Sequence, residues 1–356
     1  MILESIQSLP SVIDSLKSVD LPIFLYGMGN GAEKIYAYLK ENEIEIYGVV
    51  ASDGFVRGQS FLGFDVISVS EAERIHGRLC LVLCFGLEGE KSRFLKELAS
   101  RHYLLLPSLP VFDGGVCDKD YIVQNADRFE RVYSLLADDL SRDIFLNIIK
   151  YNVSGDISYL DGCNGLVPPA DFYTHTKRHI DIGAYDGDTV NEFIGYNNAY
   201  SDIIAFEPDG ATYKKLVKNT SGIRDVVCIN GAAGQKSGRV SFASGGGRAS
   251  HCGEGDDIDC YSVDEYCGFT HIKANGTPVG SIKIDAEGMD MPVLYGAVNT
   301  LYCCKPNVCV ALYHRAYDII DIPIFLRKHN PKYKFYLRKK EYVPAWDVFL
   351  YATEGN

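Results

Sequence analysis

The sequence lacks a long hydrophobic run and an excess of basic residues. Its longest apolar run, Leu79 to Phe85, is too short to cross a bilayer, which takes about 20 apolar residues. It holds 35 lysines and arginines against 47 aspartates and glutamates, a formal net charge of −12. That balance argues against nucleic acid and anionic membrane surfaces as partners, because phosphate contacts need a basic surface.

Metal-binding cysteine pairs and a targeting segment are also missing. No CxxC pair occurs among the eleven cysteines, and no two Cys/His pairs have zinc-ligand spacing. Several cysteines lie in strand-like runs (Cys80, Cys84, Cys228 and Cys309), which indicates buried core residues of a reduced protein. The first residues, MILESIQSLPSVIDSL, have neither a basic start nor a continuous apolar segment. We therefore expect a cytoplasmic protein without a membrane span.

The length of 356 residues exceeds what one hydrophobic core usually serves, so more than one domain is expected. Short apolar runs alternate with helical patterns, which predicts an α/β fold. We predict a smaller Rossmann-like α/β domain over 1–112, a helical bridge and loop over 113–170, and a doubly wound α/β domain over 171–356. The loop at 151–172 is rich in glycine and proline and is a candidate substrate lid.

Two regions have the apolar spacing of helices. Apolar residues three and four positions apart cover 118–136 and 138–150, and each segment begins with an aspartate suited to an N-cap. These segments predict a helical bridge packed against the second domain. An amphipathic helix is also expected over residues 1–20.

The stretch 178–209 carries the main functional signal. An apolar strand, 179–182, runs into the turn GAYDG at 183–187, and a second strand, 202–206, ends in Glu207. Turn glycines let a ligand approach the backbone closely, and an acid ending the next strand can accept hydrogen bonds from ribose hydroxyls. The stretch therefore predicts half of a doubly wound nucleotide site.

Three acids crowd this turn: Asp181, Asp186 and Asp188, the last expected to cap a helix over 189–196. Their charge would repel a pyrophosphate but suits a cationic ligand. S-adenosylmethionine fits, because it offers an ammonium and a sulfonium to carboxylates and a ribose diol to Glu207. The alternative is an ordinary α/β crossover with acidic caps.

The segment Gly231-Ala-Ala-Gly234 follows the next predicted strand, and its small residues leave room for a flat adenine. The expected cofactor-binding residues are Asp181, Gly183, Ala184, Tyr185, Asp186, Glu207, Pro208, Ala232 and Asp285. The later loop at 244–257 is glycine-rich and is expected to be mobile.

A second glycine turn lies near the N-terminus. Residues 27–32 fit GxGxxA between a predicted strand, 21–26, and a predicted helix, 32–42. A dinucleotide site usually has an acid after the second strand, where this chain has Ala51, with Asp53 two residues later. A structural or sugar-nucleotide-sensing role is therefore favoured over NAD. An NAD-dependent oxidoreductase that uses this turn is kept as an alternative.

Candidate catalytic residues end two later strands. The strand 280–284 delivers Lys283 and Asp285, and the strand 307–313 is followed by His314. Ligands of doubly wound sheets bind outside the carboxyl ends of the strands, so Asp285 and His314 are candidate bases, with Lys283 able to tune them. His314 is favoured, since its ordinary pKa is near 6.5. It could instead only bind substrate or cap the strand.

Two weaker patterns occur in the same half of the chain. Asp285, Glu287 and Asp290 could gather Mg²⁺, but their spacing is loose and no metal is expected. A basic cluster could hold a phosphate-bearing acceptor, although a solvated face is the simpler interpretation. Its members are Arg327, Lys328, Lys332, Lys334, Arg338, Lys339 and Lys340.

The chain ends in two predicted strands, 332–338 and 347–352, with too few residues between them for a crossover helix. They must form an antiparallel hairpin. A parallel sheet that finishes in a reversed hairpin distinguishes methyltransferase sheets from dehydrogenase sheets. The expected fold is thus α/β: a class I methyltransferase doubly wound sheet, preceded by the smaller Rossmann-like domain and the helical bridge.

Four motifs in this order resemble the FkbM family of S-adenosylmethionine-dependent methyltransferases. They are DIGAYDGDT from Asp181, FEPD from Phe206, KIDAEG from Lys283 and LYHR near Tyr313, and the resemblance covers roughly 138–352. The glycine turn of residues 1–112 is similar to that of the small Rossmann-like domain at the N-terminus of some bacterial sugar-modifying enzymes.

The family resemblance implies O-methylation of a hydroxyl on a saccharide or related natural product, with S-adenosylmethionine and without a required metal. The implied partner is a small-molecule or glycan acceptor. A homo-oligomer is compatible with the sequence, which does not identify the acceptor. A non-catalytic S-adenosylmethionine-binding protein is a further alternative.

Overall fold

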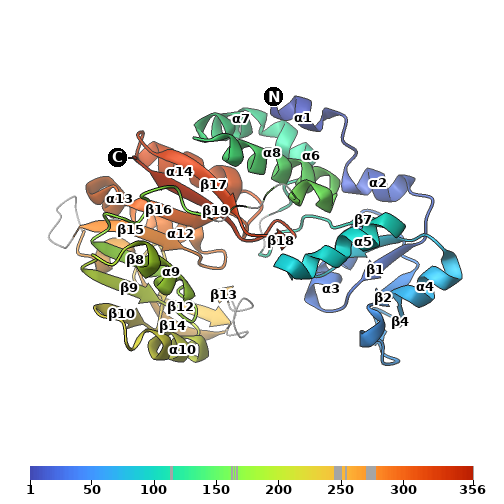
Figure 1. Ribbon diagram of the computed structural model, residues 1–356, viewed down its shortest axis with the longest axis horizontal. Helices are drawn as coiled ribbons and strands as arrows, with labels where there is room; N and C mark the ends of the chain where they lie inside the picture. Colours follow the sequence, from blue (N-terminus) through green and yellow to red (C-terminus); the bar gives the residue numbers. More distant parts are fainter. Residues whose placement is uncertain are drawn as a thin grey trace.

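Two sheets lie side by side in the computed structural model, with a group of helices above the space between them (Figure 1). The structure describes residues 1–112, 115–161, 163, 165, 167–243, 251–252, 255–269 and 278–355. Most of the loop 244–257, for which mobility was predicted, lies outside these residues.

The N-terminal sheet has six strands, and all its neighbours are parallel except the first pair. In spatial order these are β3 (Ser60–Phe61), β4 (Phe64–Ser68), β2 (Gly48–Ala51), β1 (Ile23–Tyr26), β5 (Cys80–Leu83) and β7 (Tyr103–Leu105). The connecting helices are α3 (Asn30–Glu41), α4 (Val69–His76) and α5 (Arg93–Arg101). Every residue of β2 and of β5 is buried, as expected for strands covered on both faces.

The C-terminal sheet has seven strands. In spatial order these are β10 (Val226–Ile229), β9 (Asp202–Phe206), β8 (Arg178–Ile182), β15 (Val279–Ile284), β16 (Asn307–Ala311), β19 (Val348–Thr353) and β17 (Lys334–Lys339). The first five are parallel to one another, whereas β19 runs antiparallel to both β16 and β17. The predicted reversed hairpin is therefore confirmed.

Both faces of this sheet are covered. In β9 successive side chains point to opposite faces, and the side chains on both faces are buried. Ile204 and Phe206 belong to the core on one face, while Ile203 and Ala205 belong to the core on the other. The helices that follow its strands are α9 (Asp188–Tyr196), α10 (Gly210–Thr220), α12 (Asp290–Tyr295), α13 (Val298–Cys304) and α14 (Asp318–His329). A smaller sheet of β11 (Ala232–Ala233), β14 (Asp256–Tyr261), β12 (Gly238–Ala243) and β13 (His251–Cys252) precedes the short helix α11 (Val263–Tyr266).

The helices before the C-terminal domain pack on its sheet. They are α6 (Lys119–Gln124), α7 (Ala126–Leu135) and α8 (Asp139–Ser154), and their buried residues share one core with β8, β15 and β16. Asp138 caps α8 by accepting a hydrogen bond from the Ser141 amide. Short 3-10 turns at Asp53–Phe55, Gly89–Ser92 and Ile157–Leu160 complete the secondary structure.

Three predicted helices are broken in the structure. The expected helix 1–20 is α1 (Ile2–Gln7) and α2 (Val12–Ser18), because Pro10 cannot continue a helix and Ser11 caps the second. The helix 118–136 breaks at Asn125, whose side chain donates to the Tyr121 carbonyl. A third helix, expected from the sequence over 291–301, is broken at Gly296, whose carbonyl accepts hydrogen bonds from Ser262 and Asp264 instead of from its own helix.

The two sheets are joined by backbone contacts as well as by packing. Strand β18 (Tyr342–Val343), from the segment between β17 and β19, pairs antiparallel with β6 (Leu87–Glu88) of the N-terminal half. In Figure 1 β18 lies near the centre of the molecule, between the two sheets. The Phe112 amide donates to the His314 carbonyl at 3.1 Å, so the segment after β7 also contacts the C-terminal half.

Seven of the ten cysteines whose side chains are described are buried, and none of the ten forms a disulfide. Among the described residues, no helix combines the length and the apolar character that a membrane crossing needs.

The ion pair between Asp138 and Arg338 joins the bridge to the C-terminal sheet, and we expect its loss to be costly. Arg338 Nη2 donates to Asp138 Oδ2 at 2.7 Å, and the arginine side chain is only 9% exposed. Replacing Asp138 by alanine leaves this guanidinium without its charge partner and removes the α8 cap. The free energy of unfolding should fall by about 3 kcal/mol in chemical denaturation.

Asp139→Ala is the matched control, since Asp139 is 95% exposed and pairs with Arg142 on the surface. It should cost less than about 1 kcal/mol. Equal losses in the two variants would contradict the importance given to the buried pair.

Candidate functional site

The turn after β8 is shaped by a close approach between two backbone segments. Gly183 has a φ of 72°, and a Cβ at this position would lie 1.9 Å from the Asp285 carbonyl oxygen. The amides of Gly183 and Ala184 both donate to the Phe206 carbonyl. Only glycine fits this position, so the turn is fixed between the ends of β9 and β15.

Glu207 follows β9 and is held by the same turn. Its Oε2 accepts a hydrogen bond from the Tyr185 amide at 3.0 Å, and its Oε1 accepts one from the Asp209 amide at 2.9 Å. The residue is 7% exposed. Burial raises the pKa of Glu207 to about 7, against the two amide hydrogen bonds that lower it.

Below the turn, Lys283 and Asp181 form a buried ion pair with 3.3 Å between Nζ and Oδ1. Lys283 Nζ also donates to the Gly183 carbonyl at 2.6 Å, and Asp181 Oδ2 accepts from Thr189 Oγ1 at 2.5 Å. Burial alone would lower the pKa of Lys283, but the carboxylates of Asp181, Asp285 and Asp188 outweigh it and raise the pKa. Lys283 therefore stays charged beneath the turn.

A cavity of about 340 Å³ opens beside the turn, and we call it the turn cavity. Small residues, Gly231, Ala232 and Ala233, form part of its wall. Its charged side chains are Asp188, Glu207, Lys283, Asp285, Glu287, Lys340 and Asp347. Five carboxylates thus face two lysines, one of which is already paired with Asp181.

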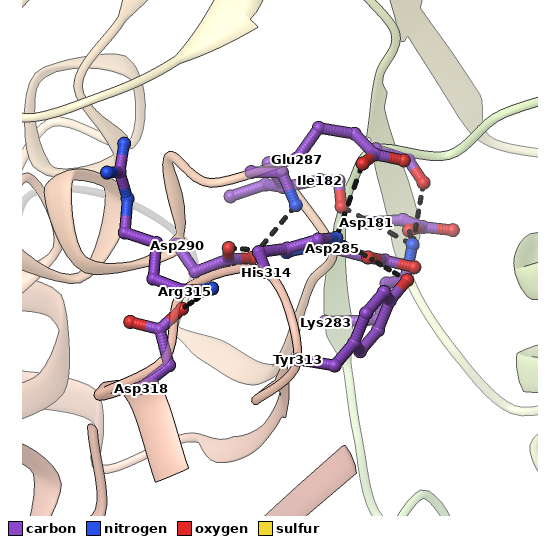
Figure 2. Close-up of polar contacts among 12 residues, drawn as sticks. Asp181, Ile182, Lys283, Asp285, Glu287, Asp290, Tyr313, His314, Arg315 and Asp318 are labelled. Carbon is purple, nitrogen blue, oxygen red and sulfur yellow. Dashed lines mark hydrogen bonds and ion pairs between the residues drawn. The ribbon is translucent and has the colours of Figure 1, made fainter. Parts of the chain in front are cut away.

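A second cluster surrounds His314, which is fully buried after β16 (Figure 2). Its Nδ1 lies 2.7 Å from Asp290 Oδ2, and its Nε2 lies 3.3 Å from Asp285 and 3.4 Å from Glu287. Burial alone would lower the pKa of His314, but Asp290 and then Glu287 and Asp285 raise it well above 6.5. The imidazole is therefore a buried cation, and the pKa of Asp290 is lowered in return.

Asp285 lies between this cluster and the turn cavity. It lines the cavity, its side chain is 23% exposed, and Tyr313 donates a hydrogen bond to its Oδ1 at 3.1 Å. Figure 2 shows Asp285 and Tyr313 on the same side of the cluster as Lys283. Of the three predicted catalytic residues, Asp285 is the one with a partly exposed side chain, while His314 and Lys283 are buried.

The predicted cofactor residues divide into two groups. The first group lines the turn cavity: Gly183, Tyr185, Glu207, Pro208, Ala232 and Asp285. The second group lies behind or beside it: Asp181, Ala184 and Asp186. Asp181 acts through Lys283 and Thr189.

Several lining residues were not predicted: Thr189, Phe242, Met289, Asp347 and Phe349. Two more, Asp188 and Lys340, were noted from the sequence for their charge but were not among the predicted site residues. Asp188 was expected as one of the three acids of the turn and as a helix cap, but the N-cap of α9 is Gly187. Lys340, Asp347 and Phe349 come from the hairpin of β17 and β19, where spacing along the sequence gives no indication of this cavity.

The contacts of these residues weaken the two alternatives from the sequence, a Mg²⁺ site and a basic cluster that holds a phosphate. Asp290 uses both carboxylate oxygens, one for the Ala286 amide and one for His314, so it has little to offer a cation. Within the described chain no group of three or more His, Cys, Asp or Glu is arranged to hold a metal. Arg338 and Lys339 of the basic cluster are buried, and burial lowers the pKa of Lys339 to about 8.

The His314 cation should stabilise the fold in a pH-dependent way. Because its pKa is raised on folding, its contribution is complete below the ordinary value and is lost as pH rises through the raised value. The facing groups are Asp285, Glu287, Asp290 and Asp318. We expect His314→Gln to lower the free energy of unfolding by about 3 kcal/mol near neutral pH, and by less in alkaline buffer.

Thermal melts across this pH range measure the difference. His175→Gln, at an exposed histidine, should give no such pH-dependent gap. A stability difference between wild type and His314→Gln that stays constant into alkaline buffer would contradict a buried cation.

Comparison with known proteins identifies the C-terminal half. Residues 181–344 match the model of the methyltransferase FkbM domain. A crystal structure of an FkbM methyltransferase from Methylobacillus flagellatus has a TM-score of 0.70 to this chain at 18% identity, covering 99% of this chain and 92% of that one. At this identity the likeness establishes the fold, and it confirms the predicted class I methyltransferase architecture.

Two further structures are much less similar. An rRNA methylase from Streptococcus thermophilus has a TM-score of 0.32 at 12% identity, covering 51% of this chain and 90% of that one. Fibrillarin from Aeropyrum pernix, with natively bound S-adenosyl-L-methionine, has a TM-score of 0.32 at 10% identity, covering 51% and 68%. No curated protein matches the sequence. The residues that match this domain model, 181–344, include the turn, Glu207 and the His314 cluster, and the chain is a methyltransferase.

Proposed function

We propose that the turn cavity binds S-adenosylmethionine and that the protein methylates a hydroxyl of a small acceptor, a saccharide or a related natural product. The observation that carries this proposal is the placement of Glu207. It is a nearly buried acid at the end of β9, fixed by two backbone amides, and it lines the same cavity as Asp285. An acid at this position of a doubly wound sheet is suited to a ribose diol.

The charge of the cavity supports a cationic ligand. Five carboxylates line it against Lys283 and Lys340, and Lys283 is neutralised by Asp181. A pyrophosphate would be repelled, whereas an ammonium and a sulfonium are attracted. Gly231, Ala232 and Ala233 leave room for an adenine on the opposite wall. When bound, S-adenosylmethionine supplies a methyl group on a positively charged sulfur.

The chain's own residues then position the acceptor hydroxyl and remove its proton. We propose Asp285 as the general base, because its carboxylate reaches the cavity and Tyr313 orients it. His314 was favoured from the sequence, but as a buried cation it lacks a free site for a proton. Its role is to hold the carboxylates of Asp285 and Glu287 in place.

An NAD-dependent oxidoreductase built on the N-terminal glycine turn has less support. The nearest acid after β2, Asp53, accepts a hydrogen bond from Ser70 Oγ at 2.7 Å. That carboxylate is thus occupied by the start of α4, where a dinucleotide would need it for a ribose.

Glu207→Gln tests the cofactor site. The amide keeps the shape of the side chain but loses the charged acceptor, so the affinity for S-adenosylmethionine should fall about 10- to 100-fold in calorimetry. Because the pKa of Glu207 is raised to about 7, wild-type affinity should also weaken as pH falls through that value.

Asp186→Asn, in the same turn but outside the cavity wall, is the control and should bind nearly as well as wild type. If Glu207→Gln bound as tightly as this control, the site assignment would have to be abandoned.

Asp285→Asn tests the base. Methyl transfer from radiolabelled S-adenosylmethionine to the small molecules of a bacterial extract should slow by about 10²- to 10⁴-fold. Binding of S-adenosylmethionine should change far less, because Glu207 is intact. Transfer at a near wild-type rate would count against Asp285 and reopen the choice of base.

A further inference from the structure

The proposed methyl donor carries a negative group as well as its two positive ones. Its methionine end holds an ammonium and a carboxylate on the same carbon, and both need partners in the turn cavity. The five acidic residues that line this cavity attract the ammonium but repel the carboxylate. A donor site therefore needs one positive charge at a defined place in an otherwise acidic lining.

The order of the strands indicates where that charge has to be. Across the sheet the strands follow one another as β10, β9, β8, β15, β16, β19 and β17. The small residues suited to an adenine, 231–233, lie just after β10, and Glu207, proposed for the ribose, follows β9. If the donor lies with its adenosine at that end, its methionine end points toward β15, β16 and the hairpin. Lys340 and Asp347 of the hairpin line this part of the cavity.

Two lysines are among the described residues of the lining, and they differ in what they can reach. The Lys283 side chain is only 5% exposed, pairs with Asp181 and donates to the Gly183 carbonyl, so its charge is neutralised beneath the turn. Lys340 directly follows β17 and is half-buried. It is thus the lysine with a side chain that is able to turn toward a ligand in the cavity.

The side chain of Lys340 lies on the same side of the sheet as α9. Burial raises the pKa of Glu192, which belongs to α9, and the charge of Lys340 acts in the opposite direction. Lys283 and Asp188, which line the turn cavity, also act on this carboxyl. The ammonium of Lys340 is therefore close to the inner end of the cavity.

Hydrogen bonds hold the backbone that carries Lys340. Its amide donates to the Asp347 carbonyl at 3.1 Å, and its carbonyl accepts from Lys339 Nζ at 2.8 Å. Lys339 Nζ also donates to the carbonyl of Tyr342, where β18 begins its pairing with β6. Because the backbone is fixed, less freedom is lost when the Lys340 side chain binds a ligand.

We propose that Lys340 binds the carboxylate at the methionine end of the donor, so that the site selects S-adenosylmethionine over related compounds that lack this group. The inference rests on the function proposed above and deepens it. The acidic residues of the lining face the ammonium and the sulfonium, and Lys340 faces the one negative group. Of the basic cluster noted in the sequence, Lys340 is the member that lines this cavity.

Decarboxylated S-adenosylmethionine makes a direct test available. It keeps the adenosine, the sulfonium and the amine, and it lacks only the carboxylate. In calorimetry, the wild-type protein should bind S-adenosylmethionine about tenfold or more tightly than the decarboxylated compound.

Lys340→Met removes the charge and keeps an unbranched side chain of similar length. The two ligands should then respond differently. The affinity for S-adenosylmethionine should fall about tenfold or more. The affinity for the decarboxylated compound should stay equal or rise, because a cation that repels it is gone.

Lys334→Met is the matched control, since Lys334 is exposed at the other end of the same strand and lies outside the cavity. Both affinities should be unchanged in this variant. Thermal melts identify a variant that fails to fold. If Lys340→Met does not fold, Lys340→Gln serves for the same comparison.

Three results would overturn the inference: equal wild-type affinity for the two ligands, an unchanged affinity for S-adenosylmethionine in Lys340→Met, or an equal loss for both ligands in that variant. The last would mean that Lys340 only supports the fold of the hairpin. In each case the wild-type protein still binds S-adenosylmethionine, and the proposed function stands. A wild-type protein that does not bind S-adenosylmethionine would refute the function itself.

Discussion

The buried ammonium of Lys283 is the interaction on which the arrangement of the site depends. It joins Asp181 of β8 to the Gly183 carbonyl, so the ends of two neighbouring strands are tied through one charged group. Asp181 in turn accepts from Thr189 at the start of α9. If this ion pair were absent, the Gly183 carbonyl would lose a buried donor and the Asp181 carboxylate would be an unpaired charge.

A second buried cation, His314, does the same for the other half of the site. Both cations lie next to carboxylates of the site, so part of the negative charge around the turn cavity is neutralised by buried groups. This explains how five acidic residues can line one cavity in the folded chain. Negative charge toward a ligand is retained, while repulsion among the acids is offset by groups that the ligand does not touch.

Much of the fold and part of the site could be predicted from the sequence, and the predictions that failed did so for physical reasons. The order of strands and turns followed from period-two burial and glycine placement, and Glu207 followed from its position after β9. The role of His314 did not, because an isolated pKa near 6.5 says nothing about three surrounding carboxylates.

Cavity residues from the hairpin, such as Asp347 and Phe349, were also missed. Their neighbours in space are distant in sequence, and the hairpin itself carries no glycine turn or acidic motif that would mark it. Helix breaks at Asn125 and Gly296 depend on hydrogen bonds to side chains or distant segments, which propensity alone does not register.

The pairing of β6 with β18 has a consequence for how such an enzyme could diversify. One short ladder joins the N-terminal α/β unit to the C-terminal half, while the cavity proposed for the methyl donor is lined by residues of 182–349. Exchange or drift of residues in the first hundred could then proceed without disturbing the lining of that cavity. The N-terminal unit and the donor site would be inherited on different parts of one gene.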